Sequence, residues 1–240
     1  MIPLFDYFLS ITPGFLVYAA LLIVVPREQT ILRILLHIAF FVLARDAMTS
    51  IGFWQISAGT LRFTAAPTTL LLLAAVSGAL CLGILWLERP ARQGMHWFGH
   101  GPLPSIAIGV AGAALISLVA AALKAVFALS SLPVPAANTL VVLVVFALVA
   151  NAYEELLFRG LLQNTLGKSM TAGRAALVSG LFFCLCHAYL ATTVTHIGAP
   201  VLLFTLLEGL VAAFVYIRAG LLGATLTHGL AIAAIATGLY

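Results

Sequence analysis

The sequence has little charge. Only 8% of its 240 residues are Asp, Glu, Lys or Arg, and 63% are hydrophobic, whereas a typical soluble globular domain is about 25% charged. This composition excludes a soluble protein. Cysteines are few as well: Cys81, Cys184 and Cys186 lie in apolar runs without metal-ligand spacing, so they are interpreted as packing residues. Residues 1–15 contain no Lys or Arg, which excludes the basic start of a secretory signal.

Long apolar runs recur along the whole chain. A membrane-spanning helix needs about 20 apolar residues to cross a hydrocarbon core of about 30 Å, and about eight runs approach or exceed that length. They lie at residues 5–25, 30–48, 68–88, 104–129, 139–163, 175–190, 199–217 and 221–240. The sequence therefore predicts an all-α, polytopic membrane protein of about eight transmembrane helices, with any active site between helices in the membrane.

The basic residues indicate topology. The net charge of +4 comes from residues scattered singly along short connections, so we predict contact with the lipid bilayer and no nucleic-acid partner. Most lie in the connections after the first, third, fifth and seventh helices, which predicts that these face the cytoplasm and that both termini face outward. His37 and Asp46, in or near the second helix, are interpreted as interfacial.

The polar connection at residues 88–103 is the predicted internal boundary, because it combines charge, Gly, Pro, Trp and His. It separates an N-terminal three-helix segment, residues 1–103, from a five-helix catalytic core, residues 104–240, within one membrane domain.

Three ionisable residues stand inside the fifth predicted helix, in the stretch NAYEELLFRG at 151–160. An ionisable side chain at membrane depth costs about 2.5–3.5 kcal/mol on insertion scales, so each is a functional candidate that needs a partner. Adjacent helical residues point about 100° apart, so Glu154 and Glu155 are expected to have different roles. Glu155 and Arg159 stand at i and i+4, a favourable order for an ion pair. Glu154 is left to find a partner elsewhere.

Two histidines supply candidate partners for Glu154. His187 lies in the sixth predicted helix and His228 in the eighth, and from the helical rise all three residues lie roughly 11–18 Å from the same membrane side. Such a set suits hydrolysis, with Glu154 and His187 activating a water and His228 donating to the oxyanion. It also matches a zinc site of two His and one Glu. A lone intramembrane His, in contrast, is usually a hydrogen bond between helices.

These residues resemble the motifs of a known family. EELLFR at 154–159 is similar to the EExxxR motif of the CPBP family, the CAAX-protease and bacteriocin-processing group of glutamic-type intramembrane endopeptidases. FCLCH matches its second motif, FxxxH, with Phe183 and His187, and the segment around His228 resembles its closing region. The resemblance covers about residues 139–240. It implies a metal-independent glutamic peptidase, in which Glu154 and His187 activate water and His228 holds the oxyanion.

The same resemblance implies that Glu155, Arg159 and Phe183 shape the site, and that no cofactor is needed, with zinc as the second alternative. The family usually carries Asn four residues after the last histidine, whereas this chain has Ile232. Loss of one oxyanion donor typically costs about 10²–10³ in rate. Thr225, Thr227 and Asn151 are alternative donors, although such side chains commonly bond to their own helix.

Glu208, in the seventh predicted helix, is the remaining deep carboxylate. It either lines the site or lies nearer the surface, since intramembrane acids rarely face lipid.

Three functions remain open from the sequence. The first is an intramembrane endopeptidase that cleaves a membrane-associated polypeptide, in an integral membrane protein of a prokaryotic plasma membrane. The second is a catalytically weak or inactive scaffold of the same family, which Ile232 favours. The third is a proton-coupled transporter with a relay of carboxylates, against which stands the absence of detectable inverted repeats.

Overall fold

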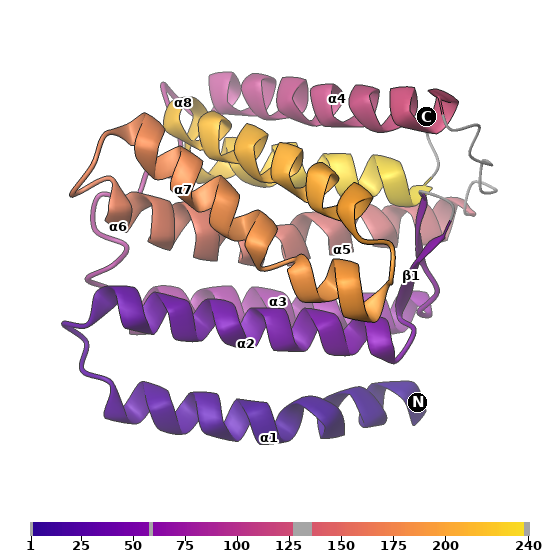
Figure 1. The fold of residues 1–240 in the computed structure, drawn as a ribbon, viewed down its shortest axis with the longest axis horizontal. Coiled ribbons are helices and arrows are strands. Elements are labelled where there is room, and N and C mark those ends of the chain that lie inside the picture. Colours follow the sequence, from indigo (N-terminus) through magenta and orange to yellow (C-terminus); the bar gives the residue numbers. More distant parts are fainter. Residues whose placement is uncertain (1, 58–59, 127–135, 238–240) are drawn as a thin grey trace.

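The chain folds into a bundle of helices that run side by side (Figure 1). The computed structural model describes residues 2–57, 60–126 and 136–237. Its helical elements are α1 (Ile2–Val24), α2 (Thr30–Ser50), α3 (Pro67–Leu87), α4 (Pro102–Val126), α5 (Ala137–Glu155), η1 (Leu156–Gln163), α6 (Asn164–Leu166), α7 (Ala172–Leu185), η2 (Leu190–Val194) and α8 (Ala199–Thr237). The predicted helix ends at 127–129 and 238–240 lie outside the described residues.

Six helical stretches of the described chain are long and apolar enough to cross a membrane. They are Leu4–Val24, Pro67–Leu87, Pro102–Ala122, Thr139–Leu166, Ala172–Val194 and Ala199–Thr237. The prediction of an all-α, polytopic integral membrane protein is therefore confirmed. α2 has a similar length but is less apolar, because it carries Arg33, Arg45 and Asp46.

α8 (Ala199–Thr237) consists of two antiparallel halves, each long enough to cross the membrane once. Its 39 residues would span roughly 58 Å as a straight helix, about twice the hydrocarbon thickness. The chain breaks at Gly220, where φ is 65° and ψ is −166°, and Figure 1 shows the second half running back beside the first. The amides of Leu221 and Leu222 donate to the carbonyls of His96 and Trp97 at 2.7 and 3.0 Å. The seventh and eighth predicted helices thus correspond to the two halves of α8.

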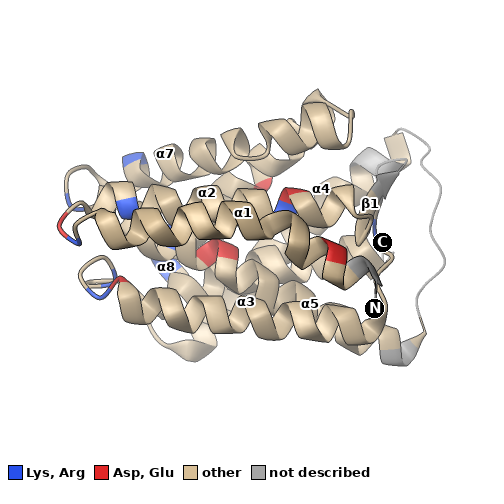
Figure 2. Cartoon of the chain, turned by 90° about the horizontal axis from the view of Figure 1, so that it is seen from below, with Lys and Arg blue, Asp and Glu red and all other residues tan. Residues whose placement is uncertain are grey.

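The two ends of the bundle differ in charge. The turns from α1 to α2, from α3 to α4 and from α6 to α7 lie at one end with the break in α8 (Figure 1), and Lys and Arg gather there (Figure 2). This separation follows the pattern of basic connections in the sequence. Which end faces the cytoplasm stays a prediction, as does the division at residue 103.

An antiparallel hairpin at the opposite end was not predicted. Its strands are β1 (Trp54–Ser57) and β2 (Thr60–Phe63), and Trp54 pairs with Phe63. Trp54 is buried with Tyr7 and Phe146 in an apolar cluster. The hairpin therefore closes one end of the bundle and leaves the all-α class unchanged.

A buried polar cluster joins the first three helices at the basic end. Glu88, which follows α3, accepts hydrogen bonds from Arg33 Nε and Nη2 at 3.0 and 2.7 Å. His37 Nε2 lies 2.9 Å from the same carboxylate, and its Nδ1 lies 2.7 Å from the Tyr18 hydroxyl. His37 is fully buried and Asp46 is 6% exposed. Each has a charged partner inside the bundle, Glu88 for His37 and Arg45 for Asp46. Their interfacial depth in the membrane stays a prediction.

Candidate active site

The two glutamates lie where α5 gives way to the π-helical segment η1. Such π-helical segments are rare and frequently occur at functional sites. Glu154 is 6% exposed, and Glu155 and Arg159 are fully buried. Arg159 Nη1 donates to Glu155 Oε1 at 2.7 Å, so the predicted ion pair is confirmed. Arg159 Nη2 donates to the Gly209 carbonyl of α8 at 2.7 Å, which ties this pair to α8.

Phe183 packs against both the arginine and the histidines of the site. The Arg159 guanidinium carbon lies 4.5 Å from the centre of its ring, a distance typical of a cation–π contact. The rings of His187 and His228 lie 4.6 and 5.5 Å from the same ring, measured between centroids. Phe183 is fully buried, so it fixes the space that these three side chains share.

His228 lies among three carboxylates. Its Nδ1 lies 2.8 Å from Glu155 Oε1, and because Glu155 also accepts from Arg159, Nδ1 is the donor of this hydrogen bond. The other ring nitrogen, Nε2, lies 3.4 Å from Glu208 Oε1 and 3.9 Å from Glu154 Oε2. The Glu155–Arg159 pair therefore has a further partner that its spacing in the sequence does not reveal, because Glu155 also orients His228.

His187 lies in a turn, whereas the sequence predicted a position inside the sixth helix. α7 ends at Leu185, and the amide of His187 donates to the Cys184 carbonyl at 2.9 Å. Nδ1 of His187 donates to the Phe183 carbonyl at 2.8 Å, which leaves Nε2 to face Glu154 Oε1 at 3.7 Å. This separation is too long for a direct hydrogen bond, so the two groups face each other across a short gap.

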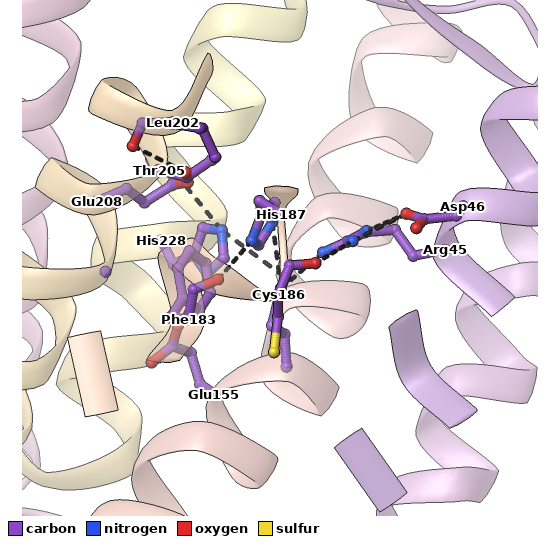
Figure 3. A network of polar contacts seen from close by, with 12 residues as sticks. Arg45, Asp46, Glu155, Phe183, Cys186, His187, Leu202, Thr205, Glu208 and His228 are labelled. Atoms are coloured by element: carbon purple, nitrogen blue, oxygen red, sulfur yellow. Dashed lines mark hydrogen bonds and ion pairs between the residues drawn. The ribbon is translucent and has the colours of Figure 1, made fainter. Parts of the chain in front are cut away.

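Arg45 of α2 reaches the same place, and the sequence analysis missed it. Its Nη1 lies 4.0 Å from Glu154 Oε1, and its Nη2 donates to the Cys186 carbonyl at 2.8 Å. Its Nε donates to Asp46 Oδ1 at 2.9 Å. Figure 3 shows Glu208, His228, His187 and Arg45 following one another across the site. The available signal was a charged pair, Arg45–Asp46, at the end of an apolar run.

Five of the side chains described above border one cavity of about 650 Å³. Glu154, His187, Glu208, His228 and Arg45 line it, together with mostly apolar side chains from α1, α2, α3, α5, α8 and the hairpin. Glu208 thus lines the site, and this resolves the two alternatives left by the sequence. Glu154 Oε1 and Glu208 Oε1 are buried and have no hydrogen-bond partner among the described residues.

Position 232 lines the cavity but offers no hydrogen-bond donor, because the side chain of Ile232 is apolar. Of the alternative donors, Asn151 lines the cavity, but its amide nitrogen donates to the Ala147 carbonyl of its own helix at 2.6 Å. The Thr227 hydroxyl donates to the Gly109 carbonyl of α4 at 3.1 Å, a bond to another helix. Neither Thr225 nor Thr227 is among the described residues that line the cavity.

The donor set gives no support to the zinc alternative. Within residues 2–57, 60–126 and 136–237, no three His, Cys, Asp or Glu side chains are arranged to hold a metal ion.

Comparison with known proteins gives one match. Residues 136–233 match the family model described as type II CAAX prenyl endopeptidase Rce1-like. No curated protein and no solved structure matches the chain. The matched segment contains α5, η1, α7 and most of α8, and it includes every candidate site residue taken from the sequence, whereas Arg45 lies outside it. The match over residues 136–233 supports the resemblance of this segment to the CPBP family, the CAAX-protease and bacteriocin-processing group of membrane proteases.

Proposed function

We propose that the chain is an intramembrane endopeptidase that hydrolyses a peptide bond in a membrane-associated protein or peptide. The single observation that carries the proposal is the position of Glu154. It lines the mostly apolar cavity, and its buried Oε1 lies 3.7 Å from His187 Nε2 without a hydrogen-bond partner among the described residues. A carboxylate at that depth is costly and has a function by default. The family match adds that proteases share this segment.

Glu154 and His187 together activate the attacking water. Because His187 Nδ1 donates to the Phe183 carbonyl, its Nε2 accepts one hydrogen of the water while Glu154 accepts the other. This leaves an oxygen lone pair to attack the scissile carbonyl carbon, and the proton passes to Glu154 as the new C–O bond forms. Glu154 then returns the proton to the leaving amine as the C–N bond breaks.

His228 stabilises the negative charge that develops on the carbonyl oxygen. As an imidazolium it donates from both ring nitrogens, from Nδ1 to Glu155 and from Nε2 toward the oxyanion. Glu155, Arg159 and Phe183 hold the ring in place, and such fixed donors cost no reorganisation during the reaction. Glu208 lies 3.4 Å from Nε2, and we propose that it holds the imidazolium before substrate enters.

The test is a cleavage assay in liposomes. Purified protein is reconstituted with a panel of prenylated C-terminal peptides, leader peptides and membrane anchors, and products are identified by mass spectrometry. Wild type is expected to cleave at least one class, and Glu154→Gln to lose that cleavage while keeping its fold. Glu28→Gln, an exposed glutamate in the α1–α2 turn, is the matched control. Cleavage that persists in Glu154→Gln contradicts the assigned base.

A second candidate is a catalytically silent scaffold that binds a membrane-associated segment for a partner enzyme. The observation that favours it is Ile232, which puts an apolar side chain in the cavity where the family usually has a donor. Binding of a panel peptide without any cleavage by wild type would favour the scaffold over the endopeptidase. For localisation, we propose the plasma membrane of a prokaryote, which membrane fractionation tests.

A further inference from the structure

We propose that Arg45 is a positioning residue for the Glu154–His187 pair, so that the N-terminal helices complete the active site. This inference rests on the proposed function but concerns a part of the chain, residues 1–135, that no comparison covers. The family match lies outside α2 and therefore gives that helix no role. The argument starts from how the guanidinium is held.

Two nitrogens of Arg45 are fixed by hydrogen bonds within the protein. Nε donates to Asp46 Oδ1 at 2.9 Å, and Nη2 donates to the Cys186 carbonyl at 2.8 Å. The Phe41 ring, with its centre 5.5 Å from the guanidinium carbon, limits the plane of the group. The third nitrogen, Nη1, is buried and has no hydrogen-bond partner among the described residues. It is the one that points toward Glu154 Oε1, at 4.0 Å.

The bond to Cys186 connects Arg45 to His187. In an uninterrupted α-helix the Cys186 carbonyl would accept from residue 190, but the chain leaves the helix after Leu185. The break frees this carbonyl, and Arg45 occupies it. Cys186 directly precedes His187, so the Arg45 guanidinium fixes the backbone that carries the imidazole. The same guanidinium also faces the Glu154 carboxylate.

Charge also favours this role. Of the described residues that line the cavity, Arg45 is the only Lys or Arg, whereas Glu154 and Glu208 both contribute carboxylates. A cation 4 Å from a carboxylate stabilises the ionised form that a general base needs. A surface ion pair with Asp46 would need neither the contact with Cys186 nor a buried, unpaired Nη1, so a solely structural role leaves both features unexplained.

The first test is kinetic, with rates expressed per folded molecule. Arg45→Gln is expected to lower kcat by about 10²-fold, the usual cost of displacing catalytic groups by about 1 Å, with little change in KM. Arg45→Lys should retain more activity, and Arg27→Gln, in an exposed turn, should match wild type. Added guanidinium should raise the rate of Arg45→Ala and leave Arg27→Ala unchanged, which a folding defect would not produce. Wild-type kcat in Arg45→Gln overturns the proposal and leaves the endopeptidase function standing.

A second test does not depend on cleavage. The unfolding temperatures of wild type, Arg45→Gln, Glu154→Gln and the double variant form a double-mutant cycle, which isolates the coupling between the two side chains. We expect non-additive shifts in this cycle and additive shifts when Arg27→Gln replaces Arg45→Gln. Additive shifts in both cycles contradict the proposed contact, whether or not a substrate has been found. Coupling without any cleavage by wild type supports the contact and counts against the endopeptidase function alone.

Discussion

Replacing Glu155 with Gln should impair the site by weakening the hold on His228. The carboxylate is fully buried and its Oε1 accepts from both Arg159 and His228, at 2.7 and 2.8 Å. An amide can keep the oxygen that accepts both hydrogen bonds, but it removes the negative charge beside the Arg159 guanidinium. It also puts a new N–H₂ group in the buried place of Oε2, which has no hydrogen-bond partner among the described residues. Each hydrogen bond to a charged group contributes about 1.5–3 kcal/mol, and removing one partner of a buried ion pair costs about 3–5 kcal/mol.

We therefore expect Glu155→Gln to lose roughly 3 kcal/mol of stability. For a chain of this size that loss lowers the unfolding temperature by roughly 6–12 °C. The activity per folded molecule should fall by about 10²-fold, because a neutral amide holds the His228 imidazole less firmly in position than the carboxylate does. Thermal unfolding in detergent and the liposome cleavage assay measure the two effects, with Glu28→Gln as control. If Glu155→Gln unfolds and cleaves like that control, the hydrogen bonds around His228 do not have the role argued above.

Three other substitutions test separate parts of the account. Ile232→Asn should raise the cleavage rate by up to about 10²-fold by restoring an oxyanion donor; an unchanged rate in the same assay would show that position 232 does not limit the enzyme. Gly220→Ala should lower the unfolding temperature, because the backbone there has φ of 65° and a Cβ would lie 2.7 Å from the His96 carbonyl oxygen; wild-type stability would mean that the break in α8 tolerates a side chain. Burial by itself raises the pKa of Glu88, but the partners His37 and Arg33 outweigh it and lower the pKa from 4.5 to about 2. A pKa that is lower in the folded than in the unfolded protein stabilises the fold above pH of about 4.5, and this contribution is lost as pH falls toward 2. Unfolding temperatures measured across this range should therefore depend less on pH in Glu88→Gln than in wild type. An equal dependence of unfolding temperature on pH in both proteins would contradict the assignment.

The helices could be predicted from the sequence because apolar runs of spanning length admit few alternatives in a membrane. The separate seventh and eighth helices were also predictable, since a run of 39 residues is too long for one crossing. The hairpin of β1 and β2 was not, because each strand has only four residues and the side chains that cover it come from distant helices. Its stability comes from burial of Trp54 against α1 and α5, which is a tertiary contact.

The candidate site was predictable only in part. The i and i+4 spacing of Glu155 and Arg159 predicted their ion pair. It could not reveal that His228, from another helix, would form a hydrogen bond to the same carboxylate. Beside the turn at His187, the Cys186 carbonyl accepts a hydrogen bond from Arg45, a contact between residues 141 positions apart. Arg45 itself was interpreted as one of several topology charges, because nothing local distinguishes it from them.

The most direct test of the central claim is a single-turnover reaction in water labelled with heavy oxygen. Wild type in liposomes is mixed with the cleaved peptide class, and the new C-terminal carboxyl group is examined by mass spectrometry. Activation of water by Glu154 predicts one labelled oxygen in that carboxyl group, formed during the first turnover, and no product from Glu154→Gln. Labelled product formed at the wild-type rate by Glu154→Gln, or no product from wild type, would contradict the account.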